Sequence, residues 1–306
     1  MESLDLRVLG DVLAWRQTGR RVTLVTVVET WGSAPRPPGA LLAVRDDGVV
    51  SGSVSGGCVE DDLIARIKAG EYDALAHPSM VAYGVSKEEA ARFGLPCGGT
   101  LRLLVEPKPE LAVLEAILSS ISNHQITSRT VDLSTGKSKL EDGNRNEAFI
   151  CNAQLMKTTY GPRWRMVIIG AGQLSLYTAD FALASDFEVI VIDPREEYAE
   201  GIDRAQIQFI KGMPDDVLLE IGVDSHTAVV ALTHDPKLDD MALMEALRSP
   251  AFYVGALGSR NNTQKRKERL QEFDLNQDQV DRLHGPVGIY IGALTPPEIA
   301  VSILAE

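Results

Sequence analysis

Apolar residues follow two different rhythms along this chain, and the rhythm changes near residue 160. Beyond that point, short apolar and β-branched runs alternate with longer segments whose apolar residues recur at helical spacing. Strands that alternate with helices in this way predict a parallel, doubly wound sheet. The expected strands cover 165–172, 188–195, 206–212, 227–235 and 251–258, and the expected helices cover 173–186, 214–222, 238–249, 261–273 and 295–306.

The first half of the chain lacks such a regular alternation. A β-branched, almost continuously apolar run over 21–30 predicts a buried strand, and an Asp-Asp-Gly turn at 46–48 joins two further strands. The pattern also predicts helices over 4–19, 59–70, 87–94 and 109–121, a strand over 100–106 and a hairpin around Thr135-Gly136. We therefore expect a mixed α/β domain over residues 1–158, followed by the doubly wound domain over 159–306.

The composition suits a chain of this kind. At 306 residues, with 44% hydrophobic and 24% charged residues, there is enough apolar material for two cores. No apolar run reaches the ~18–20 residues of a membrane span, and the N-terminus does not resemble a signal peptide. Three scattered cysteines do not make a disulfide framework, so we expect a cytoplasmic protein. The net charge of −13 argues against nucleic acid and anionic membranes as partners.

One glycine-rich turn carries a recognisable motif. GAGQLS (170–175) follows an expected strand and opens an expected helix, and Asp193 closes the next strand. Gly170 permits the tight turn, Gly172 lets a pyrophosphate approach the backbone, and small Ser175 stands at the third glycine position. This context predicts a Rossmann-like doubly wound parallel sheet. Asp193 would accept a hydrogen bond from a ribose and favours NAD over NADP; the alternative is a Rossmann fold that holds no dinucleotide.

A basic segment lies near the end of the fifth expected strand. Residues 258–269 carry Arg260, Lys265, Arg266, Lys267 and Arg269 against the single acid Glu268. In so acidic a chain this favours a small anionic ligand, although the segment is also compatible with the solvated face of a helix. Because ligands of open α/β sheets bind at the carboxyl ends of strands, Gly258, Ser259 and Arg260 are candidate phosphate-binding residues.

Other chemistry-bearing residues give weaker signals. His234 also follows a strand, and a ligand-site histidine and an ordinary loop histidine fit it equally well. Cys58 in SGGC precedes a helix and Cys97 in CGG precedes a strand, whereas Cys151 fits an apolar core strand. The acids at 60–62 oppose ionisation of the Cys58 thiol and stabilise the first helical turn, which argues against a nucleophile. The flanking glycines indicate that a ligand approaches the backbone closely; they are Gly56, Gly57, Gly98 and Gly99. No zinc, hydrolase or kinase motif is present in the sequence.

Taken together, these segments resemble the xanthine dehydrogenase accessory (XdhC/CoxI) family. ETWGSAPRPPGALLAV, SGSVSGGCVEDDLI and GLPCGGTLRLLVEP resemble its N-terminal region. RMVIIGAGQLS, VIDPREEYA, ALTHDPKLDD, YVGALGSRNNTQKRKERL and LHGPVGIYIGALTPPEIAVSILAE resemble its C-terminal Rossmann-type half. Two positions depart from the family pattern, because Gln173 stands where histidine is usual and Tyr290 where an acid is frequent.

The resemblance implies a chaperone without a catalytic residue of its own. Such proteins bind the molybdenum cofactor, a molybdopterin that carries Mo, and protect it while a cysteine desulfurase-type donor supplies sulfur. They then deliver it to a molybdenum hydroxylase of the xanthine dehydrogenase type, and we expect a homo-oligomer. Cys58 and Cys97, with their flanking glycines, become cofactor-contacting residues, and both thiols become candidate contacts of Mo. The alternatives are an NAD-dependent oxidoreductase and a thiol redox sensor that forms a Cys58–Cys97 disulfide.

Overall fold

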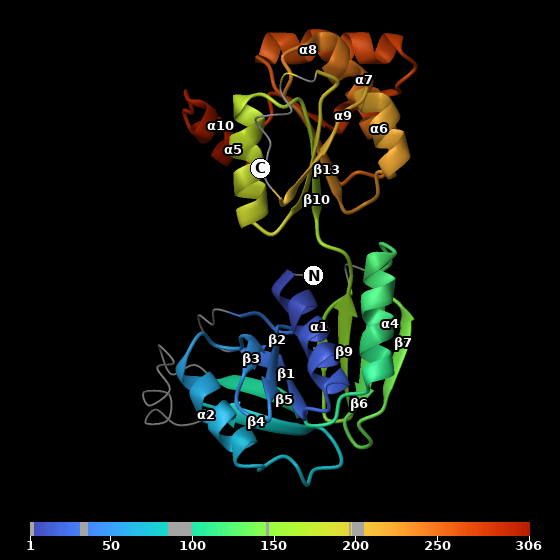
Figure 1. Cartoon of the computed structure of the whole chain (residues 1–306). Coiled ribbons are helices and arrows are strands. Elements are labelled where there is room, and N and C mark those ends of the chain that lie inside the picture. The colour runs from blue at the N-terminus through green and yellow to red at the C-terminus, as the bar shows by residue number, and fades with distance from the viewer. Residues whose placement is uncertain (1–2, 31–35, 85–99, 145–146, 196, 198–204) are drawn as a thin grey trace. The chain divides into compact units, whose positions relative to one another are not determined.

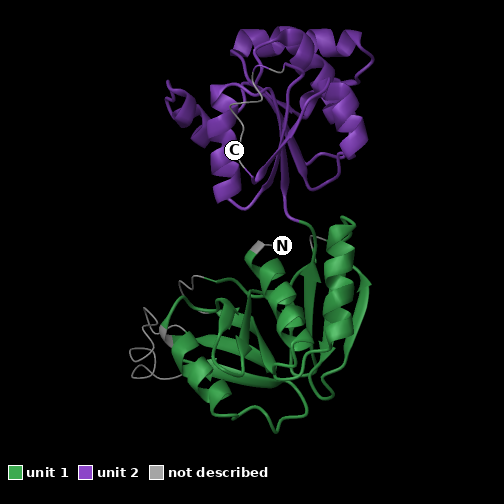
Figure 2. Cartoon of the chain, in the orientation of Figure 1, with its two compact units in different colours: residues 1–162 green, residues 163–306 purple. Residues whose placement is uncertain are grey.

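The computed structural model describes residues 3–30, 36–84, 100–144, 147–195, 197 and 205–306, apart from the side chains of Ser3 and Cys58. The chain divides into two compact units, Met1–Pro162 and Arg163–Glu306 (Figure 2). The last strand of unit 1 extends to Tyr160, so a boundary after residue 158 would cut through that strand. The expected helix over 87–94 lies outside the described residues.

Unit 1 is built around a five-stranded antiparallel sheet (Figure 1). Its strands in spatial order are β3 (Val50–Gly52), β2 (Leu41–Arg45), β1 (Val22–Thr30), β5 (Leu101–Glu106) and β4 (Ser79–Tyr83). Helices α1 (Ser3–Gln17) and α4 (Leu111–Ser122) pack on one face, and α2 (Cys58–Lys68) packs on the other.

Burial of both faces explains the uninterrupted apolar run in β1. Val22 and Leu24 pack in the core with α1 and α4, whereas Val25 and Val27 pack in the core with α2. Since successive side chains of a strand point to opposite faces, a strand covered on both sides needs apolar residues at nearly every position.

A second, four-stranded antiparallel sheet completes unit 1. Arg129 on this sheet is fully buried and donates two hydrogen bonds, of 2.6 and 3.1 Å, to the buried carboxylate of Glu106 at the end of β5. This ion pair ties the two sheets together. The strands in spatial order are β7 (Ser138–Asp142), β6 (Thr127–Asp132), β9 (Leu155–Tyr160) and β8 (Ile150–Cys151).

Unit 2 contains a six-stranded parallel sheet with the spatial order β12-β11-β10-β13-β14-β15, as a doubly wound fold requires. Helices α5 and α10 cover one face, and α6, α7, α8 and α9 cover the other (Figure 1). The predicted α/β class is therefore confirmed. The strands are β10 (Arg165–Ile169), β11 (Glu188–Ile192), β12 (Ile207–Ile210), β13 (Thr227–Ala231), β14 (Tyr253–Ala256) and β15 (Leu283–His284). The helices are α5 (Gln173–Ala184), α6 (Pro214–Ile221), α7 (Pro236–Arg248), α8 (Arg260–Glu272), α9 (Gln277–Asp281) and α10 (Pro296–Ala305).

Some elements were not expected from the sequence pattern. Strand β4 has five residues, of which only Tyr83 is buried; α9 also has five residues, and β15 has two. Cys151 is not a plain core residue: it is partly exposed and lines an open pocket of about 650 Å³ together with Met80 and Phe149. Burial raises the pKa of its thiol, so Cys151 is a neutral side chain at neutral pH.

Candidate functional site

The strand register of unit 1 brings its three glycine- and proline-rich segments to one end of the five-stranded sheet. Thr30 at the end of β1 pairs with Leu101 at the start of β5, and Leu101 also pairs with Tyr83 at the end of β4. On the other side, Leu42 of β2 pairs with Gly52 at the end of β3. The chain segments 31–40, 53–58 and 84–100 therefore all leave or enter the sheet at the same end, which we call the loop end.

The described part of the loop end contains the glycines before α2 that the sequence singled out. Gly56 and Gly57 lie in the described loop before α2, and Gly56 has a φ of 90° that favours glycine. Cys58 is the first residue of α2, but its side chain lies outside the described part, as do Cys97, Gly98 and Gly99. The described strand ends that flank residues 85–99, at Tyr83 and Leu101, lie at this end of the sheet.

A single carboxylate organises the loop before α2. The amides of residues 54–57 all donate hydrogen bonds to Glu60, over 2.7–3.0 Å. The hydroxyl of Ser53 donates a further bond of 2.8 Å, and the hydroxyl of Ser55 donates another. Burial would raise the pKa of Glu60, but these hydrogen bonds outweigh it and lower the pKa to about 2. Glu60 is therefore ionised at neutral pH and holds the glycine loop in one conformation.

A second carboxylate anchors the proline-rich segment. Asp5 of α1 accepts a hydrogen bond of 3.1 Å from the guanidinium of Arg36 and another of 3.0 Å from the amide of Leu41. Both charged side chains are largely buried, with 14% of Arg36 and 11% of Asp5 exposed. The end of the proline-rich segment is therefore fixed to α1. No pattern in the sequence signals this pair, because the two residues are distant along the chain.

In unit 2, the predicted glycine turn lies at the carboxyl end of β10. Gly170 has a φ of 97°, and a Cβ atom there would approach Thr233 Cγ2 to 2.8 Å, so a side chain does not fit. Gly172 caps α5 in an extended conformation, and among the described residues a Cβ atom there would have no neighbour within 4 Å. No described residue therefore fills the space beside Gly172, which suits the approach of a phosphate group to a helix N-terminus.

Asp193 has a different environment from the one expected for a ribose-binding acid. Its side chain is fully buried and accepts hydrogen bonds from the amide of Ala171 (2.8 Å) and from the guanidinium of Arg195 (2.7 and 2.9 Å). Burial would raise the pKa of Asp193, but the bonds from Arg195 and Ala171 lower it overall. Asp193 therefore fixes the glycine turn, and a ribose hydroxyl would have to replace one of these internal partners.

The remaining predicted residues of unit 2 belong to the same edge of the sheet. His234 is exposed, with a φ of 63°, directly after the Thr233 that packs against Gly170. Ser259 caps α8 by accepting a bond of 3.2 Å from the amide of Asn262, and Arg260 is exposed. Strand β14, which leads to Gly258, lies beside β13, which leads to His234. The carboxyl edge of this sheet therefore carries Gly170, Gly172, Asp193, His234, Gly258, Ser259 and Arg260.

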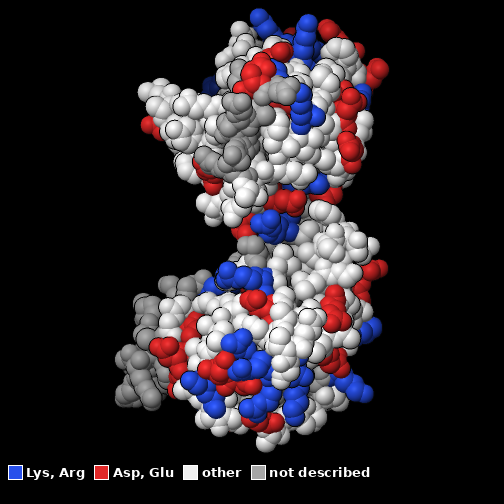
Figure 3. Space-filling model, viewed as in Figure 1, with Lys and Arg blue, Asp and Glu red and all other residues white. Residues whose placement is uncertain are grey.

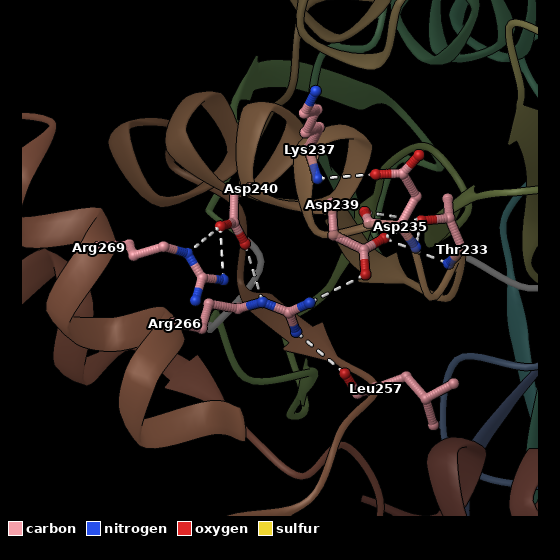
Figure 4. Close-up of polar contacts among 8 residues, drawn as sticks. All are labelled: Thr233, Asp235, Lys237, Asp239, Asp240, Leu257, Arg266 and Arg269. Atoms are coloured by element: carbon pink, nitrogen blue, oxygen red, sulfur yellow. Dashed lines mark hydrogen bonds and ion pairs between the residues drawn. The ribbon is translucent and has the colours of Figure 1, made fainter. Parts of the chain in front are cut away.

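The basic segment after β14 corrects one expectation. Arg266 is neither a ligand-binding cation nor part of a solvated helix face, because its side chain is buried and bonded internally (Figure 4). Its guanidinium donates to Asp239 (3.0 Å), to Asp240 (2.9 Å) and to the carbonyl of Leu257 (3.0 Å). Arg269 also donates to Asp240, over 2.8 Å. Two of the five basic residues thus balance buried acids within unit 2.

This network positions both loops of the carboxyl edge. Asp239 is fully buried and accepts hydrogen bonds from the hydroxyl (2.7 Å) and the amide (3.2 Å) of Thr233. Burial raises the pKa of Asp239, although Thr233 and Arg266 act in the opposite direction. Through Arg266 the same carboxylate is connected to Leu257, so the loops after β13 and β14 share one rigid support.

Charge and metal ligands give limited further information. Basic and acidic side chains are interspersed on the visible face of unit 1 (Figure 3). Among the described residues, no group of three or more His, Cys, Asp or Glu side chains is arranged to hold a metal ion. In the same part of the chain, no helix is long and apolar enough to cross a membrane.

These features define a protein with two α/β units, one with a loop-bearing antiparallel sheet and one with a Rossmann-type sheet. Residues 166–306 match the family description "XdhC Rossmann domain", and residues 15–84 match "XdhC and CoxI family". The chain belongs to the XdhC and CoxI family, as the resemblance predicted.

Three known proteins are similar over most of their length. The chain is 27% identical to the molybdenum cofactor insertion chaperone PaoD of Escherichia coli K12, over 94% of this chain and 83% of PaoD. It is also 27% identical to a protein of Bacillus subtilis 168 named as a probable xanthine dehydrogenase component, over 92% and 91% of the two chains. A crystal structure of a protein named xanthine dehydrogenase from Bacillus halodurans superposes with a TM-score of 0.77 at 27% identity, covering 98% of this chain and 94% of that one.

Proposed function

We propose that this protein is an accessory chaperone that binds the molybdenum cofactor and delivers it to a molybdenum hydroxylase of the xanthine dehydrogenase type. The cofactor is cargo here and not a resident group. The observation that supports the proposal is the loop end of unit 1, because the strands that flank the proline-rich segment and the two cysteine-bearing segments end or begin there. The similarity to a chaperone named for this cofactor, over 94% of this chain and 83% of that protein, supports it.

The residues suit the chemistry of such a cargo. Molybdopterin carries a phosphate or a nucleotide, and unit 2, considered on its own, would offer backbone amides to such an anionic group at the first turn of α5 after Gly172. The metal–dithiolene end is soft, and thiols such as those of Cys58 and Cys97 are the ligand type that soft metals prefer. In this proposal the protein binds and shields the cofactor while a cysteine desulfurase-type donor supplies sulfur.

The direct test is retention of pterin by the full chain purified from a molybdate-replete host that makes the cofactor. Oxidation converts bound molybdopterin to a fluorescent pterin that can be measured per mole of protein. Cys58→Ser, Cys97→Ser and the double variant should lose pterin, whereas Cys151→Ser is the matched control and should retain it. Wild-type protein that carries no pterin above the level of a cofactor-deficient host would overturn the proposal.

An NAD-dependent oxidoreductase remains the competing function for the Rossmann-type unit. The structure argues against NAD binding at this turn, because Asp193, the expected ribose partner, already accepts hydrogen bonds from Ala171 and Arg195. Titration of NADH into the pure protein separates the two proposals. Micromolar binding with substrate-dependent oxidation of NADH would favour the enzyme, and absence of binding alongside copurified pterin would favour the chaperone.

A further inference from the structure

Two features of the loop before α2 bear on what it can bind. It has the shape of an anion-binding loop, since the four consecutive amides of residues 54–57 point to one place at a helix N-terminus. That place is already filled by the carboxylate of Glu60, which belongs to the first turn of the same helix. The loop therefore binds its own anion.

We propose that Glu60 is the positioning residue of the loop end: its carboxylate fixes the glycine loop that leads to Cys58 and closes this loop to external anions. The inference rests on the proposed function and concerns which end of the cargo this loop receives. Because the amides of 54–57 are occupied and a negative charge lies among them, the phosphate of the cargo is excluded from this loop. The uncharged pterin and the metal–dithiolene part are the portions that remain for it.

The other unit provides a direct contrast within the same chain. At the N-terminus of α5, no described side chain caps the helix, and the space around Gly172 is open. The α2 loop thus donates four amides to a carboxylate of its own helix, whereas in the α5 turn the amide of Ala171 bonds the carboxylate of Asp193. Two glycine turns that look alike in the sequence, SGGC and GAGQ, therefore differ in how many of their amides are already bonded to a carboxylate.

The geometry explains why a carboxylate at residue 60 is required. Its two oxygens accept six hydrogen bonds, four from amides and two from hydroxyl groups. A glutamine side chain has one acceptor oxygen, and its NH₂ group would face amides that are themselves donors. Loss of this partner leaves several loop amides unsatisfied, so the loop no longer holds a single conformation.

The experiment uses the full chain with Glu60→Gln, Glu60→Ala and, as the matched control, Asp61→Asn. Asp61 is the next residue on the same helix and is exposed, so its variant removes a charge without disturbing the loop. We expect both Glu60 variants to retain at least about tenfold less pterin than wild type, since several charge-assisted bonds are lost. The control should match wild type.

Chemical rescue distinguishes a positioning role from a general loss of stability. Glu60→Ala removes the equivalent of one acetate, so added sodium acetate should refill the space and restore pterin binding, whereas sodium chloride at equal ionic strength should not. Thermal unfolding, followed in parallel, should show that the Glu60 variants still unfold cooperatively.

The outcomes of this experiment distinguish a failure of this inference from a failure of the proposed function. If wild type and Asp61→Asn bind pterin and the Glu60 variants bind it equally well, the positioning role is wrong while the chaperone function stands. Lost binding that acetate does not restore also contradicts this inference. If wild type itself binds no pterin, the proposed function has failed, and the inference fails with it.

Discussion

Arg266 and Asp239 form a buried ion pair that connects the two loops at the carboxyl edge of the parallel sheet. Asp239 receives the hydroxyl of Thr233 from one loop, and Arg266 binds the carbonyl of Leu257 from the other (Figure 4). Both charges are almost fully excluded from bulk water, so each depends on the other for its solvation. Removal of either charge should therefore destabilise unit 2.

Arg266→Ala should destabilise unit 2 by about 3–5 kcal/mol, because it leaves the buried Asp239 carboxylate without its cation. The measurement is urea unfolding followed by circular dichroism. Lys265→Ala is the control: it removes an exposed positive charge from the same helix and should change the free energy of unfolding by less than about 0.5 kcal/mol. Equal effects of the two substitutions would contradict the structural role of Arg266.

The buried pair of Glu106 and Arg129 in unit 1 should show non-additive behaviour. Either Glu106→Leu or Arg129→Met alone leaves one buried charge uncompensated and should cost about 3–5 kcal/mol. The double variant removes both charges and should be more stable than either single variant. A double-mutant cycle by urea unfolding measures this coupling, and simple additivity would contradict it.

Two glycines of the α5 turn should respond differently to the same substitution. Gly170→Ala should destabilise the protein by about 1–3 kcal/mol, since its φ of 97° is unfavourable for alanine and the added Cβ meets Thr233. Gly172→Ala should leave the free energy of unfolding nearly unchanged, because the backbone there is extended and the space is open. If a phosphate binds at this turn, Gly172→Ala should nevertheless weaken ligand binding, which isothermal calorimetry can detect.

Asp193 predicts a defined dependence of stability on pH. Its pKa in the folded protein lies below the value of 3.8 expected for an unperturbed Asp, so the folded state favours the ionised form. The stabilisation is therefore fully present above about pH 5 and is lost as the pH falls through the folded-state pKa. The difference in unfolding free energy between wild type and Asp193→Asn should be constant from about pH 7 to 5 and shrink below about pH 4. A difference that grows on acidification would contradict this assignment.

The fold was predictable where the pattern of apolar residues reports burial directly. Strands β10, β11, β13 and β14 are largely buried on both faces, and each was expected from a nearly continuous apolar run, whereas the edge strand β12 gave a weaker signal because polar residues interrupt its apolar ones. Strand β4 was missed because only one of its residues, Tyr83, is fully buried, and its sequence therefore contains no alternating apolar pattern typical of a strand. The strand is held in place by its backbone pairing with β5. Short β15 depends on β14 in the same way.

The sequence predicted the role of a candidate-site residue only where that role depends on the backbone conformation of the residue itself. Gly170 and Gly172 follow from the need for a tight turn and for an open approach. Asp239 and Arg266 could not be paired from the sequence, since charge density along a helix does not reveal which side chains are buried. Glu60 was expected to act as a negative charge near a helix N-terminus, but not to fold back onto the preceding loop.

Because the loop-end segments of unit 1 all leave or enter one end of the five-stranded sheet, the opposite end is a suitable position for a reporter group. The turn between β2 and β3 lies there, and the side chain of Val49 on this turn is 42% exposed. A small fluorophore attached at this residue would lie away from the loop end of unit 1. It would allow the proposed loading and transfer of the cofactor to be followed in real time without covering the loops proposed to bind it.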